Sequence, residues 1–505
     1  MSCDVLIVGA GPTGLVLALW LTKLGAKVRI VDKTAEPGTT SRALAVQART
    51  LELYRQLGLA EAVVEKAHQV PAFNLWARGK RKARIAFEDV GFGLTPYPCI
   101  RIFPQDQHER LLVARLETEG VSVDRQTEVV GYVDHGDRVS ASLRHSERGE
   151  ETCEAAYIAG CDGAHSVVRE TIHAGFPGGT YQHLFYVADV EASGPAIDGE
   201  LHVDLDESDF LAIFPLAGQG RARLVGTVKG EAARPAEALR FDDVSNRAIR
   251  SLKLQVAKVN WFSTYRVHHR VADHFRKGRS FLLGDAAHIH SPAGGQGMNT
   301  GIGDAINLAW KLKAVLDAKA PESLLDSYES ERIGFARRLV ATTDQAFSLV
   351  TAEGGFADFV RLWIAPEALS GVFNFHAARE FGFRTLSQIN VNYRGGPLSE
   401  GKARRVHGGD RLPWVSAKGL DNYASLSEPI WQVHLYGEAG ADVIAWCAER
   451  RLPLRVFAWN SQCGDVGLAE NAVYLIRPDS YVALADETPS IETLDRYFAM
   501  RGLAR

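Results

Sequence analysis

The chain opens with a short apolar run, a glycine-rich turn and a longer apolar segment. Residues 4–8 (DVLIV) have the continuous apolar pattern of a strand buried on both faces of a parallel sheet. Residues 15–25 (LVLALWLTKLG) predict a buried helix that ends at Gly25. Residues 27–32 (KVRIVD) predict a second strand that ends on an acid. The start of the chain therefore predicts a β-turn-α-turn-β unit with a right-handed crossover.

The following residues alternate between helical and strand-like periods. Apolar spacing near 3.6 residues predicts helices at 51–68, 105–119, 304–316 and 324–365. Alternating apolar and polar residues predict strands within 70–100, 121–145 and 182–229, and residues 280–285 (SFLLGD) predict a further strand.

The tail from about residue 400 has a different pattern. Residues 428–437 (EPIWQVHLYG) predict a strand, and ADVIAWCAERR (441–451) predicts a helix. Two more strand segments follow, PLRVFAW (453–459) and AVYLIRPDSYVALAD (472–486). Strands separated by helices of this length predict a separate small α/β domain.

Length and composition narrow the class of protein. A chain of 505 residues exceeds what one hydrophobic core usually serves, so we expect about two or three domains. The formal net charge of -4 gives no electrostatic argument for nucleic acid or an anionic membrane. The six cysteines include no CxxC pair, and neither a basic signal-peptide start nor a long apolar window is present. We therefore expect a reduced, cytoplasmic protein that binds neither nucleic acid nor membrane.

The first glycine-rich turn, GAGPTG, is a GxGxxG motif between a predicted strand and a predicted helix. Gly9 allows the tight turn, Gly11 lets the backbone approach a pyrophosphate, and Gly14 allows close packing of helix and strand. The helix N-terminus presents unpaired N–H groups to phosphate, and Asp32 is placed to accept hydrogen bonds from a ribose diol. The motif alone leaves FAD and NAD open.

Two later segments also place an acidic residue just after a predicted strand, as Asp32 is placed. Residues 162–169 (DGAHSVVR) follow an apolar strand, and residues 278–288 (GRSFLLGDAAH) precede SPAGGQGMNTG at 291–301. With the GxGxxG motif, these segments make the chain resemble the class A flavoprotein monooxygenases, aromatic hydroxylases with the para-hydroxybenzoate hydroxylase fold. The tail resembles the thioredoxin-like domain of the phenol and polyketide hydroxylase subgroup.

The resemblance implies an α/β fold with a discontinuous Rossmann-like FAD-binding domain. It assigns residues 1–72, 99–180 and 266–345 to that domain, and 73–98 and 181–265 to an inserted substrate-binding β-sheet domain. A helical connection at 346–400 and a small thioredoxin-like domain at 401–505 follow. Because the tail lacks CxxC, Cys447 and Cys463 are expected to be inert.

The resemblance also implies the cofactor contacts. Asp285 binds the ribityl chain, the Gly297-Met298-Asn299 turn points N–H groups at the pyrimidine edge of the flavin, and Pro292 lies over the ring and shapes the oxygen pocket. Arg42 and Gln105 match an arginine and a glutamine that contact FAD, although Arg42 also fits a solvated loop and Gln107 is a rival for Gln105. The full set of expected cofactor residues is Gly9, Gly11, Pro12, Thr13, Gly14, Asp32, Lys33, Arg42, Gln105, Val129, Asp162, Asp285, Pro292, Gly295, Gly297, Met298 and Asn299.

Other residues have less specific signals. In the resembled family His288 is structural, and the same is expected of His290. His268 and His269 are adjacent on a strand, so their side chains point to opposite faces and do not favour a metal site. Gly303 departs from the family pattern and is expected to loosen the start of its helix. The aromatic residues within 181–186 and 210–214 fit either a flat substrate pocket or ordinary sheet core.

The implied activity is hydroxylation of a phenolic or polycyclic, polyketide-like aromatic substrate. NAD(P)H reduces FAD, O₂ forms a flavin C4a-hydroperoxide, and one oxygen is transferred to the aromatic ring. Baeyer–Villiger oxygenation, a flavin reductase or oxidase, and a non-catalytic NAD-sensing protein remain alternatives. The sequence identifies no substrate-deprotonating residue, and the tail is compatible with a homodimer.

Overall fold

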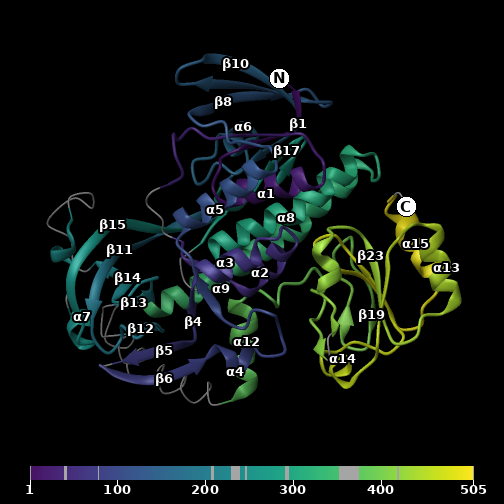
Figure 1. Cartoon of the computed structure of the whole chain (residues 1–505). Helices are drawn as coiled ribbons and strands as arrows, with labels where there is room; N and C mark the ends of the chain where they lie inside the picture. Colours follow the sequence, from purple (N-terminus) through teal and green to yellow (C-terminus); the bar gives the residue numbers. More distant parts are fainter. Residues whose placement is uncertain are drawn as a thin grey trace.

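The computed structural model describes residues 2–38, 43–77, 79–205, 210–228, 239–244, 247–290, 295–351, 375–417 and 420–503. Two of the expected cofactor residues, Arg42 and Pro292, lie outside these ranges. Three bodies are visible in Figure 1: a first sheet at the top, a second sheet at the lower left and the C-terminal part at the right.

The predicted β-α-β unit is present at the start of the chain as β1 (Ser2–Val8), α1 (Pro12–Lys23) and β2 (Val28–Val31). β1 lies between β2 and a distant strand, β10, and is parallel to both. The sheet has the order β16-β17-β10-β1-β2, and an antiparallel hairpin, β8–β9, extends it through β10. The remaining strands are β8 (Thr127–Asp134), β9 (Val139–His145), β10 (Gly149–Gly160), β16 (Arg276–Lys277) and β17 (Ser280–Leu282).

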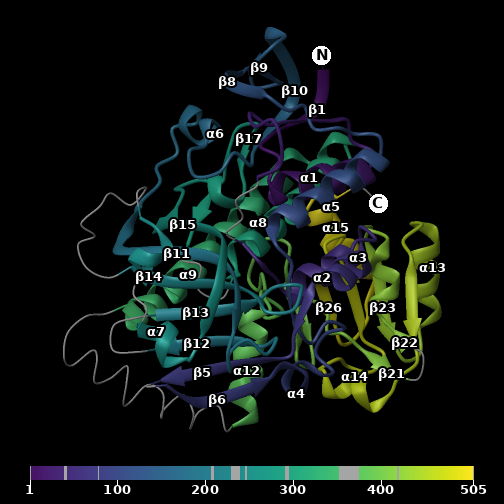
Figure 2. The ribbon, with the colours of Figure 1, turned by 60° about the vertical axis from the view of Figure 1, so that its left-hand side comes forward.

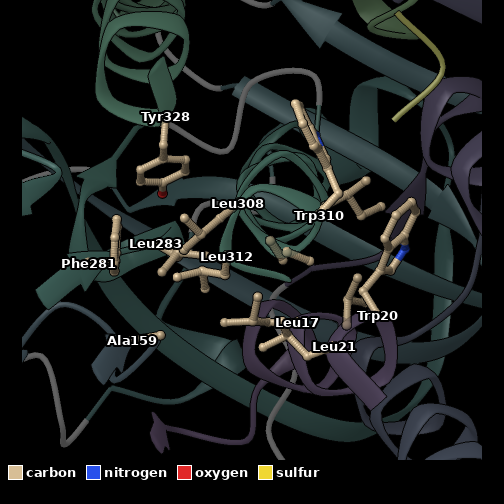
Figure 3. Packing of buried hydrophobic residues seen from close by; sticks show 14 of the residues in the cluster. Leu17, Trp20, Leu21, Ala159, Phe281, Leu283, Leu308, Trp310, Leu312 and Tyr328 are labelled. Carbon is tan, nitrogen blue, oxygen red and sulfur yellow. The ribbon is translucent and has the colours of Figure 1, made fainter. Parts of the chain in front are cut away.

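The core of this first part lies between α1 and α8 (Gly297–Leu316), with α5 (Gln105–Thr118) beside α1. Figure 3 shows Leu17 and Leu21 of α1 facing Leu308 and Leu312 of α8. All four side chains are fully buried, and each contributes about 1.5–3 kcal/mol of burial free energy. This packing fixes the direction in which the N-terminus of α8 points.

The second sheet has eight strands in the order β18-β15-β11-β14-β13-β12-β5-β6. β11 and β15 are its longest strands, and Figure 2 shows them at the upper end of the sheet, with β5 and β6 at the lower end. Its strands are β5 (Ala72–Ala77), β6 (Lys80–Ala86), β11 (Gly178–Ser193), β12 (Leu201–Leu205), β13 (Phe210–Pro215), β14 (Arg221–Val228), β15 (Gln255–Val271) and β18 (His288–Ile289).

The remaining elements before the tail lie between or after the strands of these two sheets. The helix predicted at 51–68 is two helices, α2 (Ala48–Arg55) and α3 (Ala60–Lys66), because Gly58 between them takes φ +65°. The others are β3 (Ala45–Val46), β4 (His68–Val70), α4 (Phe87–Gly91), β7 (Ile100–Ile102), α6 (Val167–Thr171), α7 (Arg247–Ser251), α9 (Asp326–Thr351) and α12 (His376–Leu386), with 3₁₀ turns η2 (Phe241–Asp243), η3 (Gly284–Ala286) and η5 (Glu322–Leu325).

The tail forms a sheet of its own with flanking helices, called the C-terminal domain below. Its six-stranded sheet has the order β20-β19-β26-β25-β23-β24, in which β23 is parallel to β24 and antiparallel to β25. Figure 2 shows this domain packed against α2 and α3. Its elements are β19 (Glu400–Ala403), β20 (Val406–His407), β21 (Ser416–Ala417), β22 (Leu420–Asp421), η7 (Ala424–Ser427), β23 (Gln432–Tyr436), α13 (Ala441–Glu449), β24 (Leu454–Phe457), α14 (Ser461–Asp465), β25 (Val473–Ile476), β26 (Val482–Asp486) and α15 (Ile491–Met500).

The thiols of this domain are buried, and burial raises the pKa of Cys463 and brings that of Cys447 to about 11. Both thiols are therefore protonated at neutral pH. Within the described ranges, no helix has both the length and the apolar composition that crossing a bilayer needs.

Candidate functional site

The candidate site lies where β1, β10 and β17 end. These three strands are parallel, so their carboxyl ends meet at one edge of the sheet. The GxGxxG turn follows β1, the segment beginning at Cys161 follows β10, and η3 follows β17. Ligands of α/β sheets bind at such an edge, where helix N-termini also point.

The three motif glycines have different surroundings. A Cβ on Gly9, which has φ +101°, would lie 2.3 Å from the carbonyl oxygen of Cys161, and one on Gly14 would lie 2.0 Å from that of Gly9. Both positions therefore need glycine for packing. A Cβ on Gly11 would meet no protein atom within 4 Å among the described residues. The open space beside Gly11 fits the approach of a pyrophosphate.

Asp32 stands at the end of β2, beside this turn. Its Oδ2 accepts a hydrogen bond from the backbone N–H of Ala10 at 2.7 Å, and its Oδ1 accepts from the N–H and the hydroxyl of Thr34 at 2.8 and 2.6 Å. Arg125 lies 3.9 Å away. The carboxylate is held next to the α1 N-terminus, which has Pro12 in its first turn and no side-chain cap.

Asp162 follows β10 and contains a buried polar atom without a partner. Its Oδ2 accepts from the N–H of Val168 at 3.3 Å, whereas its Oδ1 is buried and has no hydrogen-bond partner within the described part of the chain. Burial raises the pKa of Asp162 above its ordinary value. A buried, unsatisfied carboxylate oxygen is costly and fits a position where a bound ligand donates the missing hydrogen bond.

Arg169 links two of the three motifs. Its guanidinium donates to the carbonyl oxygens of Ala164 at 2.7 Å and Ala286 at 3.0 Å, and it stacks over Phe176 at 4.0 Å. Asp285, the next residue before Ala286, is exposed at the edge of the site. Arg169 thereby positions the turn that presents Asp285 and is itself mostly buried.

The first turn of α8 is tied to the chain before α2. The Asn299 amide donates to the carbonyl oxygens of Ala45 and Gly295, both at 2.9 Å. Its carbonyl oxygen accepts from the N–H of Gln47 at 3.0 Å and the hydroxyl of Thr50 at 2.7 Å. The side chain is thus fully engaged by protein, so only backbone N–H groups of this turn remain for a ligand. Gly297 and Met298, beside it, are half-buried.

Gln105 lies at the N-terminus of α5 and donates to Glu109 Oε1 at 2.8 Å. Glu109 is buried, which raises its pKa, and its other oxygen accepts from the N–H of Gly38 at 3.2 Å. The rival Gln107 is exposed. The structure therefore places Gln105 beside the loop that follows Asp32.

The other predicted residues are less closely grouped. Lys33 is exposed, and the side chain of Val129 is buried in the hydrophobic core. Gly303 does not interrupt α8, and a Cβ there would lie 3.2 Å from Arg332 Nη2. Instead of loosening the helix, this glycine leaves room for the guanidinium. No group of His, Cys, Asp and Glu suited to a metal occurs among the described residues.

The aromatic residues of the second sheet divide between its two faces. Tyr186 packs with Phe241 and Phe262 and is sheet core. Phe185 is also buried, on the other face, where Phe210 is half-buried. Half-buried Phe214 packs against a cluster that contains Leu44 and Ala45, close to the first turn of α8.

Sequence reasoning missed the buried charges of α8 and α9. Asp304 accepts from the Gly284 N–H at 3.0 Å and from Arg332 Nε at 2.6 Å. A signal was present, because Asp304, Asn307 and Lys311 stand at helical spacing in an otherwise apolar segment. Such a polar stripe inside a buried helix indicates internal ion pairs.

Comparisons with known proteins agree with this geometry. A family model described as an FAD binding domain matches residues 2–343. The chain is 34% identical over 527 residues to 6-methylpretetramide 4-monooxygenase from Streptomyces rimosus, covering 97% of this chain and 92% of that protein. It is 32% identical over 407 residues to rifampicin monooxygenase from Rhodococcus hoagii, covering 80% and 82%. The solved structure of OxyS anhydrotetracycline hydroxylase from Streptomyces rimosus has a TM-score of 0.79 and 29% identity, covering 100% of both chains.

Proposed function

The chain belongs to the FAD binding domain family and is an FAD-dependent aromatic monooxygenase, and we propose that its substrate is a polycyclic phenol of the polyketide type. The oxidation uses O₂ and takes its electrons from NAD(P)H. Two findings support the polycyclic substrate: the similarity over almost the whole chain to proteins named for pretetramide and anhydrotetracycline, and the half-buried aromatic face of the second sheet.

The observation that carries this proposal is the position of Ala45 between the two sheets. Its carbonyl oxygen accepts from Asn299 in the first turn of α8, and its side chain belongs to the cluster that includes Phe214. A planar ring on the Phe210–Phe214 side of the second sheet would therefore lie close to the flavin edge that α8 faces. This arrangement suits a large, flat and mostly apolar substrate.

The residues at this sheet edge suit the groups of FAD. Gly11 leaves room for the pyrophosphate at the α1 N-terminus, and Asp32 is held beside it as an acceptor for the ribose. The orphan oxygen of Asp162 and the exposed carboxylate of Asp285 lie after neighbouring strands and would accept hydrogen bonds from the cofactor's hydroxyl groups. We assign the remaining predicted contacts, including Gln105 and the Gly297–Asn299 turn, to the same cofactor.

When bound, FAD supplies the redox chemistry that passes electrons from NAD(P)H to O₂ and one oxygen atom to the ring. The protein positions the reactants and keeps the site dry. The α8 N-terminus adds a positive dipole end beside the flavin, which favours negative charge there. The apolar cluster around Leu44, Ala45 and Phe214 excludes water from the side facing the second sheet.

The tail fits a thioredoxin-like domain, which we propose as its fold. β23, α13 and β24 form a parallel β-α-β unit, and the antiparallel pair β25–β26 followed by α15 completes it. The high pKa of Cys447 supports a role without thiol chemistry.

The test is oxidation of NADH and NADPH by the purified flavoprotein against a panel of simple phenols and polycyclic phenols, with product masses. We expect polycyclic phenols to stimulate oxidation most and to gain one oxygen with the ring intact. Ring expansion to a lactone would instead indicate Baeyer–Villiger oxygenation. Turnover without oxygen incorporation would indicate a reductase or oxidase, and stimulation by simple phenols alone would overturn the polycyclic substrate.

A further inference from the structure

One turn of the C-terminal domain is buried against the FAD-binding part. Residues 477–481 (RPDSY) connect β25 and β26, and the hydrogen bond from the Arg477 N–H to the Tyr481 carbonyl closes the turn at 2.8 Å. Arg477, Asp479 and Ser480 are 1%, 2% and 4% exposed. Ser480 takes φ +64°, a left-handed conformation that costs free energy in a residue other than glycine. A buried, strained and charged turn requires compensating contacts.

Arg477 contacts α8 through Glu331 of α9. Its two terminal nitrogens donate to the two oxygens of Glu331 at 2.6 and 2.9 Å, and Asp479 accepts from the same guanidinium. Glu331 also accepts from Asn307 at 2.7 Å and from Lys311 at 2.8 Å, both on α8. Bidentate pairing of this kind is strong and geometrically specific, so the turn fixes the middle of α8.

A second contact reaches the first turn of α8. Arg49 of α2 donates from Nη2 to the Asp479 carbonyl oxygen at 3.0 Å and to the Ser480 hydroxyl at 2.9 Å. Its neighbours Gln47 and Thr50 donate to Asn299 Oδ1. The C-terminal turn therefore holds α2, and α2 holds the turn of α8 that presents its N–H groups to the site.

The ion pair between Arg55 and Asp421 lacks this connection. Arg55, also on α2, pairs with Asp421 at 2.7 Å, but both side chains are partly exposed and neither contacts α8 in a hydrogen bond that the structure shows. The 477–481 turn is thus connected to α8 by two independent routes, one through Glu331 and one through Arg49. Attachment of the C-terminal domain to the rest of the protein would not require both.

We propose that the 477–481 turn is a positioning element that sets the place of the α8 N-terminus at the flavin, and so the affinity for FAD and its midpoint potential. This proposal rests on the proposed placement of the cofactor. Helix N–H groups and the dipole act over short distances, so a small withdrawal of the first turn weakens their contact with the flavin and lowers its midpoint potential.

The test uses Arg49→Met in the full-length protein, with Arg55→Met as the matched control. Arg49→Met does not leave the buried carboxylate of Glu52 unpaired, because Glu52 keeps its two hydrogen bonds from Arg411 at 2.8 and 2.6 Å. We expect Arg49→Met to weaken FAD binding about tenfold and to lower the midpoint potential of the bound flavin. Arg55→Met should change neither quantity, and Arg49→Lys should partly restore both because it keeps a charged donor.

Two further results complete the test. Ser480→Ala removes the hydroxyl that accepts from Arg49 and donates to the Asp479 carbonyl oxygen. It should weaken FAD binding by about two- to threefold, which covers the case in which Arg49→Met does not fold. Unchanged FAD affinity and potential in Arg49→Met and Ser480→Ala would overturn the positioning role. An equal effect of Arg55→Met would overturn it too, because general loosening of the domain would then explain the loss. A wild-type protein that binds no FAD would refute the proposed cofactor placement itself.

Discussion

His288 donates a hydrogen bond from Nε2 to Asp304 Oδ2 over 2.7 Å, and both side chains are buried. Burial opposes ionisation of Asp304, but Arg332 and His288 outweigh it and hold the pKa of this carboxyl below its ordinary value. The imidazole is therefore engaged in a buried ion network that joins η3 to α8, which fits the structural role expected for His288.

Asp304→Asn should destabilise the protein by about 3 kcal/mol, because Arg332 loses its carboxylate partner while it stays buried. Urea unfolding followed by far-UV circular dichroism measures this loss. Asp317→Asn is the control: this carboxylate pairs with Lys313 and Lys319 near the surface, and its loss should cost less than about 1 kcal/mol. Equal losses in the two variants would contradict the buried network.

Stability should fall in acid through Glu331. Burial opposes its ionisation, but Arg477 and Lys311 bring the pKa of Glu331 down to about 2 in the folded protein. A carboxyl with a lowered folded pKa adds stability above the unfolded pKa of 4.5, and this contribution disappears as the pH falls towards 2. The contribution is roughly 3 kcal/mol.

Urea unfolding between pH 3 and pH 7 tests this linkage by comparing the wild type with Glu331→Gln. The difference in free energy of unfolding between the two proteins should be largest at neutral pH and shrink as the pH falls. Other acidic residues titrate in both proteins and cancel. A difference that stays constant with pH would show that Glu331 titrates normally.

Substitutions of the motif glycines Gly11 and Gly14 should affect stability and FAD binding differently. Gly11→Ala should cost less than about 1 kcal/mol of stability, since Gly11 has φ -73° and an open Cβ direction, yet weaken FAD binding roughly a hundredfold. Gly14→Ala should cost about 3 kcal/mol or more, because its Cβ would meet the Gly9 carbonyl. Flavin absorbance of the purified variants and their unfolding curves give both quantities. Normal FAD content in Gly11→Ala would contradict the assignment of the pyrophosphate.

Local patterns predicted the sheet edge well, because strand, glycine turn and helix are coded by adjacent residues. Residues 4–32 predicted β1, α1 and β2, and the placement of Gly9, Gly14 and Asp32 follows from that unit. The break at Gly58 and the short helix α4 lie outside this unit and were not predicted. A short-range pattern is sufficient where the chain folds on itself locally.

The buried network could not be predicted in the same way, because its partners are far apart in sequence. Arg477 and Glu331 are separated by 146 positions, and Arg49 and Ser480 by 431. No periodicity links such residues. The polar stripe of α8 shows only that partners must exist, and tertiary packing decides which residues they are.

The Asp162 carboxylate should lower the stability of the cofactor-free protein and strengthen the binding of FAD. Burial raises its pKa, because the ionised carboxylate with its orphan Oδ1 costs folding free energy in the protein without cofactor. A carboxyl with a raised folded pKa weakens the fold at high pH, and this cost disappears as the pH falls through that value. Asp162→Asn should therefore raise the stability of the cofactor-free protein by about 1 kcal/mol at pH 7, and by less in acid.

The same substitution should weaken FAD binding about tenfold, because an amide group replaces the acceptor that the cofactor would use. Titration of the cofactor-free protein with FAD, followed by flavin fluorescence, measures the affinity, and thermal unfolding at two pH values measures the stability. Asp137→Asn, at an exposed carboxylate beside Arg138, is the control and should change neither. If Asp162→Asn loses stability and keeps its affinity for FAD, Asp162 serves only the start of α6 through the Val168 N–H, and its free oxygen has no ligand.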